Sequence, residues 1–125
     1  MARRVVVTGI GTINPLGHNI EEYFSNLENG VSGAAPITRF NAENFKTKFA
    51  CEVKDYDYTK YFDRKEVRLY DLYTQFALIA ADQAMTDAGI DLDKINKENA
   101  GVIWSSGIGG LETFLHEVKG FVEGG

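Results

Sequence analysis

Apolar residues follow two kinds of pattern along this chain: short runs without polar interruption, and stripes with helical spacing. Residues 5–7 are a run of three valines, which is typical of a strand buried on both faces. A second run, GVIWSS, occupies residues 101–106. Each run leads into a glycine-rich segment, TGIG at 8–11 and GIGG at 107–110. We therefore predict two buried strands, each with a tight glycine turn at its carboxyl end.

Helical spacing predicts a first helix over residues 20–29. Asn19 can serve as its N-cap, Glu22 stands at the capping-box position, and Gly30 can end it in the left-handed conformation. One face of this helix is apolar and is expected to pack on the sheet; it consists of Ile20, Tyr23, Phe24 and Leu27.

A longer helix is predicted between Asp63, an N-cap with Glu66 in the capping-box position, and Gly89 at its end. After Leu72 it carries a stripe of small residues that permits close packing, so this part is predicted to be mostly buried. The stripe consists of Ala77, Ala80, Ala81, Ala84 and Ala88. A final amphipathic helix follows the second glycine turn, with Leu111, Phe114, Leu115 and Val118 on one face.

The order of these elements predicts an α/β protein with a mostly parallel sheet and packed helices. Residues 49–53 alternate in polarity and predict a short half-buried or edge strand, in which Cys51 is a small core residue rather than a nucleophile. A dinucleotide-binding turn is a further interpretation of TGIG. It is disfavoured because Asn14 and Pro15 stand where the fingerprint needs a small residue and a helix start.

Composition and charge exclude several classes of function but do not identify one. The 125 residues fit one domain, and a net charge of −5 with interspersed signs argues against a nucleic-acid surface. No apolar run is long enough for a membrane span, and no signal peptide is recognisable. The single cysteine fits a reducing, cytoplasmic compartment. His18 and His116 lie far apart in the sequence, so neither a metal site nor a cofactor is expected.

Four segments, in this order, resemble the N-terminal portion of the β-ketoacyl-acyl-carrier-protein synthases, most closely the type II enzymes of fatty-acid elongation. They are RRVVVTGIGTINPLG at 3–17, NLENGVSG at 26–33, FDRKEVR at 62–68 and SSGIGGLE at 105–112. The resemblance implies a thiolase-like fold, of which residues 1–125 supply an incomplete N-terminal domain. It also implies a homodimer that catalyses the decarboxylative Claisen condensation of acyl and malonyl thioesters carried by acyl carrier protein.

Two groups of residues match positions with a role in that family. Arg64, Lys65 and Arg68 match the basic patch that docks the acidic carrier protein, while Leu69 departs from the pattern, because a third base is frequent there. From composition alone, a solvated face paired to Glu66 and Asp71 is the favoured interpretation, and only the resemblance favours a docking patch. Gly107 and Ile108 match the turn that gates the acyl pocket, and Leu111 is expected to line the same pocket.

The family's catalytic cysteine and two histidines match nothing in residues 1–125. Cys51, His18 and His116 lie outside the corresponding motifs, so this chain is expected to be a fragment and inactive alone. A non-catalytic module that docks acyl carrier protein is the alternative function. The preferred acyl length, and the choice between fatty-acid elongation and a related polyketide-type synthase, stay open.

Overall fold

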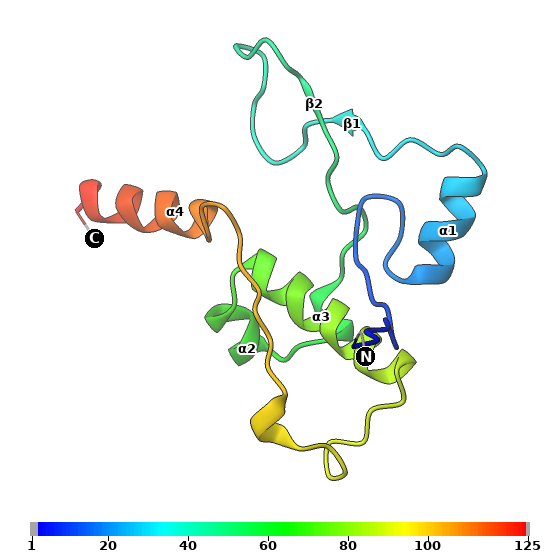
Figure 1. The fold of residues 1–125 in the computed structure, drawn as a ribbon. Coiled ribbons are helices and arrows are strands. Elements are labelled where there is room, and N and C mark those ends of the chain that lie inside the picture. Colours follow the sequence, from blue (N-terminus) through cyan, green and yellow to red (C-terminus); the bar gives the residue numbers. More distant parts are fainter. Residues whose placement is uncertain (1–2, 125) are drawn as a thin grey trace. The chain divides into compact units, whose positions relative to one another are not determined.

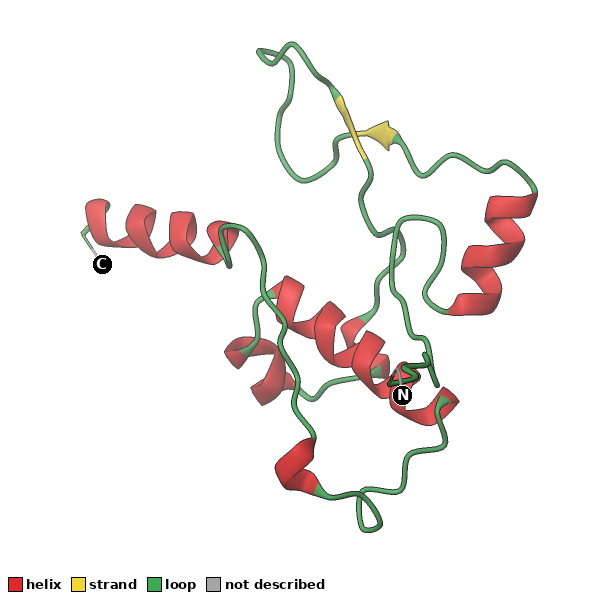
Figure 2. Ribbon diagram, in the orientation of Figure 1, coloured by secondary structure: helices red, strands yellow, loops and turns green. Residues whose placement is uncertain are grey.

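A computed structural model describes residues 3–124. Short helices joined by long loops make up most of the chain (Figures 1 and 2). The α-helices are α1 (Ile20–Glu28), α2 (Arg64–Leu69), α3 (Leu72–Asp87) and α4 (Leu111–Val122), and the 3-10 turns are η1 (Tyr58–Lys60) and η2 (Lys97–Asn99). The strands are β1 (Ala35–Pro36) and β2 (Phe49–Ala50). None of the described helices has the length and apolar character needed to cross a membrane.

The predicted helix ends are confirmed where a local side chain or glycine determines them. The side chain of Asn19 accepts a hydrogen bond from the Glu22 amide, and Gly30 follows α1 with φ of +66°. Asp63 and Glu66 form the predicted capping box of α2, and Gly89 follows α3 with φ of +62°. One detail differs, because the Glu22 carboxylate accepts from the amide of His18 at 2.8 Å rather than from that of Asn19.

The long helix predicted from Asp63 onward is in fact two helices. Tyr70 has an extended backbone, with φ of −110° and ψ of 119°. Its carbonyl accepts a 2.8 Å hydrogen bond from the side-chain amide of Gln75, and the carbonyl of Asp71 accepts from Gln75 N–H at 3.0 Å. Asp71 therefore begins a new helix, and the helical ladder is interrupted between α2 and α3.

The prediction of two buried strands is wrong for this structure. Residues 5–7 and 101–106 are irregular, and both are exposed: Val5 is 90% and Ile103 100% accessible. A strand exists only when a neighbour completes its hydrogen-bond ladder, and neither segment has such a neighbour among residues 3–124. The one described sheet is instead antiparallel, with Ala35 opposite Ala50 and Pro36 opposite Phe49.

Beside this small sheet, Glu52 closes the loop that joins β1 to β2. Its carboxylate accepts a 2.6 Å hydrogen bond from the Thr38 hydroxyl and a longer one from the Thr38 amide. The bond from the Thr38 side chain is the main reason why the pKa of Glu52 lies below its usual value, and the backbone and charge of Arg39 act in the same direction.

Two compact units make up the chain, one of residues 3–57 with 79–90 and the other of 58–78 with 91–124. In the first unit, the N-terminal segment runs along the second half of α3 (Figure 1). A Cβ atom at Gly9 would lie 2.6 Å from the amide nitrogen of Ala88, and one at Gly11 would lie 2.7 Å from that of Ala84. These glycines therefore permit close approach to the alanine stripe. Neither has a positive φ, so the tight turn predicted for them is not their role.

Polar side chains of α3 bind the backbone of the same N-terminal segment. The carboxamide of Gln83 accepts from the Thr12 amide at 3.0 Å and donates to the His18 carbonyl at 2.7 Å. Asp87 accepts from the Ile10 amide at 2.9 Å. Because irregular backbone lacks ladder partners, these bonds satisfy groups that would otherwise be unpaired.

The most buried residues all lie on α3, as the alanine stripe predicts. Ile79 is 4% exposed, and Ala77 and Ala80 are also buried. The predicted packing of the apolar face of α1 on a sheet is not observed, since Phe24 and Leu27 are each about half exposed. On α4, Phe114 and Leu115 are more than half exposed. Among residues 3–124, the buried side chains are therefore concentrated on α3.

Candidate functional site

The basic residues of α2 lie on an exposed helical surface in the second unit. Arg64, Lys65 and Arg68 are all exposed, and their spacing of three and four residues places Arg68 beside each of the other two. Leu69, which replaces a base, is 77% exposed next to them. We call Arg64, Lys65 and Arg68 the basic face of α2.

The acidic residues that could neutralise this face have other partners. Glu66 is occupied by the capping box, in which its carboxylate accepts from the Asp63 amide at 2.9 Å. The carboxylate of Asp71 accepts a hydrogen bond from the Thr113 hydroxyl. No residue in the range 3–124 forms an ion pair with the basic face. The interpretation as a face paired to Glu66 and Asp71 is therefore not what the structure shows.

The second glycine turn, residues 107–110, lies in the same unit as α2. Gly109 adopts φ of +84°, which favours glycine, and its amide donates to the Ser106 hydroxyl oxygen at 2.7 Å. Ile108 stands at the tip of the turn with 79% of its surface exposed. A Cβ atom at Gly107 would meet no atom within 4 Å. The turn is therefore closed at its base by Ser106 and open at its tip.

Leu111 lines a shallow depression of about 250 Å³ where α4 begins. The other side of the depression is formed by the start of α3, from Asp71 to Tyr73, and Gly109 and Gly110 contribute to its wall. Of the three residues predicted for an acyl pocket, only Leu111 is among those around this depression; Gly107 and Ile108 lie outside it. The depression is thus a groove at the base of the turn rather than at its tip.

The remaining candidate reactive side chains are those of Cys51, His18 and His116. Cys51 directly follows β2 and is exposed, so the prediction that it is a core residue is wrong. The apolar residues with which it was expected to pack are not collected into a core, since Phe49 is also largely exposed. The ring Nε2 of His18 lies 2.7 Å from the Lys54 carbonyl oxygen, and His116 is exposed on α4 beside Glu117.

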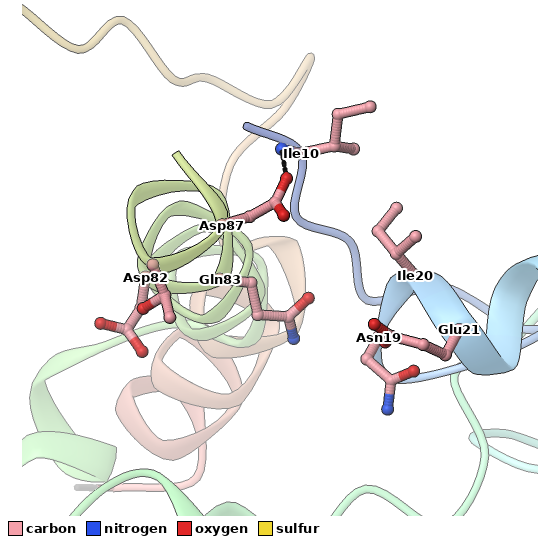
Figure 3. Close-up of a pocket in the computed structure, with 8 residues that line it drawn as sticks. Ile10, Asn19, Ile20, Glu21, Asp82, Gln83 and Asp87 are labelled. Carbon is pink, nitrogen blue, oxygen red and sulfur yellow. Dashed lines mark hydrogen bonds between the residues drawn. The ribbon is translucent and has the colours of Figure 1, made fainter. Parts of the chain in front are cut away.

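One feature that the sequence patterns did not single out is a depression of about 400 Å³ in the first unit. Figure 3 shows Asp87 reaching from α3 to the backbone of Ile10. Asn19 and Glu21, at the start of α1, line the other side of the depression. Gln83 and Asp87, four residues apart beside the alanine stripe, are the signal that could have indicated polar contacts on this side of α3. They hold the N-terminal segment in place.

Comparison with known proteins identifies the family. The model of the "Beta-ketoacyl synthase, N-terminal domain" family matches residues 2–122. Among curated proteins, the 3-oxoacyl-[acyl-carrier-protein] synthase 2 of Synechocystis is 43% identical over 110 residues, which is 88% of this chain and 26% of that protein. The synthase 2 of Vibrio harveyi is 42% identical over 98% of this chain and 30% of its own length. The chain thus spans between a quarter and a third of these relatives.

Solved structures agree with this assignment. The ishigamide ketosynthase/chain length factor superposes with a TM-score of 0.65 at 40% identity, over 75% of this chain and 23% of its own. A type II polyketide synthase ketosynthase, solved in complex with its acyl carrier protein, superposes with a TM-score of 0.57 over 77% of this chain and 25% of its own. At 24% identity, the second structure shows a shared fold alone. The chain belongs to the beta-ketoacyl synthase family, whose N-terminal domain its residues 2–122 match.

Proposed function

We propose that residues 1–125 are the N-terminal part of a 3-oxoacyl-acyl-carrier-protein synthase of the type II, fatty-acid-elongating kind. The observation that carries this proposal is the basic face of α2, three exposed cations left without acidic partners in residues 3–124 of a chain from this family. Exposed cations steer an acidic partner to its docking site. The acidic partner proposed here is acyl carrier protein, which presents the acyl and malonyl groups as thioesters.

In this proposal the bond-making residues lie outside residues 1–125. A cysteine thiolate there takes the acyl group from the carrier, and two histidines assist the loss of CO₂ from the malonyl thioester. The resulting carbanion attacks the acyl carbonyl carbon, and the cysteine thiolate leaves. Residues 1–125 contribute carrier docking through α2 and selection of acyl length through Gly107, Ile108 and Leu111. No resident metal or cofactor takes part in these steps.

The exposed valine-rich segments support the same proposal. Residues 5–7 are all β-branched, and residues 101–106 include the β-branched Val102 and Ile103; both segments are exposed and without a partner strand among residues 3–124. We expect both to become strands of a mostly parallel, thiolase-like sheet when the rest of a full-length synthase is present, and the full-length protein to be a homodimer. A single cysteine in 125 residues fits a cytoplasmic location for this enzyme.

A condensation assay tests this function. The full-length protein that contains residues 1–125 should release CO₂ and form a 3-oxoacyl product from acyl- and malonyl-carrier thioesters, whereas residues 1–125 alone should form none. Transfer of a labelled acyl group to Cys51 in the isolated residues 1–125 would contradict the assignment of catalysis to other parts of the protein. Carrier binding by the full-length protein without CO₂ release would favour the alternative, a non-catalytic docking module.

A further inference from the structure

Asp71 links three elements of the second unit. Its carbonyl accepts the amides of Thr74 and Gln75 at 2.9 and 3.0 Å, so its backbone caps α3. This use of the backbone leaves the carboxylate available for another element. The carboxylate accepts a hydrogen bond from the Thr113 hydroxyl in the first turn of α4, 42 residues further along the chain.

Gly110 makes this approach possible. It is the N-cap residue of α4 and provides no side-chain cap of its own. A Cβ atom at this position would overlap the carboxylate of Asp71, so only glycine leaves room for the acid. A negative charge at the start of a helix is favourable, because unpaired amides and the helix dipole present positive charge there. Asp71 thus places a negative charge beside the start of α4, where Gly110 supplies no side-chain cap.

The same contact lies at the base of the turn that carries Ile108. Ser106 accepts the Gly109 amide on the first side of the turn, and the Asp71 carboxylate meets Gly110 and Thr113 on the second side. Between these two anchors, the tip has open space around Gly107. The position of Ile108 therefore depends on how firmly the two sides of the base are held.

The junction that carries Asp71 is itself fixed. Gln75 is 5% exposed, and its side-chain amide donates to the carbonyl of Tyr70 at 2.8 Å. The ring of Tyr70 packs edge-on against Phe62 with 6.1 Å between ring centres. Because Tyr70 directly follows α2 and Asp71 directly precedes α3, the helix with the basic face and the base of the glycine turn are joined through one hydrogen-bonded junction.

We propose that Asp71 is a positioning residue that sets the resting place of Ile108 and thereby the acyl-length preference. This inference rests on the proposed function, in which Ile108 gates the acyl pocket. With the anchor in place, the Ile108 side chain keeps to the mouth of the pocket and opposes long acyl chains. Without the anchor, the turn moves more readily, and long acyl chains enter at less cost.

A series of acyl primers of increasing length on the full-length protein tests the positioning role. Asp71→Ala and Thr113→Val should each raise the ratio of kcat/KM for long over short primers by about threefold or more. Asp71→Asn and Thr113→Ser retain the hydrogen bond and should keep the wild-type ratio. Thr86→Val, at an exposed threonine of α3, is the control for a lost hydroxyl and should also leave the ratio unchanged. Equal changes at every primer length would overturn the proposal, because they would show a structural role only.

Two further measurements separate this inference from the proposed function. Absence of condensation by the wild-type protein would defeat the proposed function and, with it, the gating role of Asp71. Hydrogen exchange measures whether the contact between Asp71 and Thr113 holds the start of α4. Asp71→Ala should speed amide exchange there, including that of the Phe114 amide, which donates to the Gly110 carbonyl at 2.9 Å. Gly110→Ala should have the same effect, whereas Gly120→Ala, which meets open space, should not. Unchanged exchange in Asp71→Ala would show that Asp71 anchors nothing.

Discussion

The glycine-rich segments at 8–11 and 107–110, which keep the names first and second turn from their predicted role, each follow an apolar run, yet their glycines meet different surroundings. The first turn lies against α3, where Cβ atoms at Gly9 and Gly11 would collide with helix backbone. The second turn leaves Gly107 in open space and holds Gly109 at a positive φ. One pattern in the sequence thus corresponds to close packing in one place and to conformational freedom in the other.

This difference separates a scaffold from a candidate gate. Gln83 and Asp87 bind the backbone of the first turn region, so its position is determined by α3. The second turn has contacts at its base, through Ser106 and Asp71, and an exposed Ile108 at its tip. Substitutions in the first turn should therefore affect stability, and substitutions at the tip of the second should affect selectivity.

The largest expected effect belongs to Gly11→Ala. The added methyl group would lie 2.7 Å from both the Ala84 amide nitrogen and the Gln83 Cβ, and such overpacking should lower the free energy of unfolding by about 2–3 kcal/mol. Urea unfolding of the full-length protein measures this loss. Gly120→Ala is the control, since its methyl group meets open space on α4 and should not lower the free energy of unfolding. Equal losses in the two variants would contradict the close-packed first turn.

A smaller effect, confined to long substrates, is expected for Ile108→Phe. The larger side chain should obstruct the acyl channel, because its extra volume costs about 1–3 kcal/mol of strain where a long chain must pass. Long primers should lose about tenfold in kcat/KM for each 1.4 kcal/mol of lost transition-state stabilisation, while short primers react as before. A uniform loss across a primer-length series would mean that Ile108 supports the fold and gates nothing.

The smallest effect is expected on the basic face of α2, which lies outside both turns. Lys65→Glu combined with Arg68→Glu should slow association with acyl carrier protein about severalfold, and added salt should diminish the difference, since exposed charges act mainly on the association rate. Stopped-flow association at several ionic strengths measures it. Small-molecule thioesters should react as in the wild type. Lys97→Glu, at an exposed cation of η2, should have less effect; an equally large one would show that general charge, not the basic face, governs docking.

Local signals account for the parts of the fold that the sequence predicted correctly. Asn19, Asp63, Gly30 and Gly89 act within a few residues of themselves, so their sequence context was sufficient to place the helix ends. The stripe of alanines likewise indicated the helix on which the buried residues lie, although most of α3 is only half-buried or exposed. The exposure of the basic face followed from its charge, which makes burial costly.

Contacts between distant residues account for what could not be predicted. The valines of residues 5–7 predict a strand, but a strand needs a neighbouring strand to complete its hydrogen bonds, and residues 3–124 do not provide one. The anchor of the second turn likewise depends on Asp71 meeting Thr113, 42 residues further along the chain. Spacing along the sequence does not indicate that pairing. The break between α2 and α3 is different, because it involves a local bond from the Gln75 side-chain amide to the Tyr70 carbonyl, five residues apart, which the continuous helical spacing did not predict.

Hydrogen exchange at the two turns in a single wild-type sample tests the comparison most directly. The Ile10 and Thr12 amides donate to Asp87 and Gln83 at 2.9 and 3.0 Å, whereas the Ile108 amide donates to no residue in the range 3–124. We predict slow exchange for Ile10 and Thr12 and fast exchange for Gly107 and Ile108. Equal protection of the two turns, or faster exchange at the first, would contradict the assignment of one turn to the scaffold and the other to a movable gate.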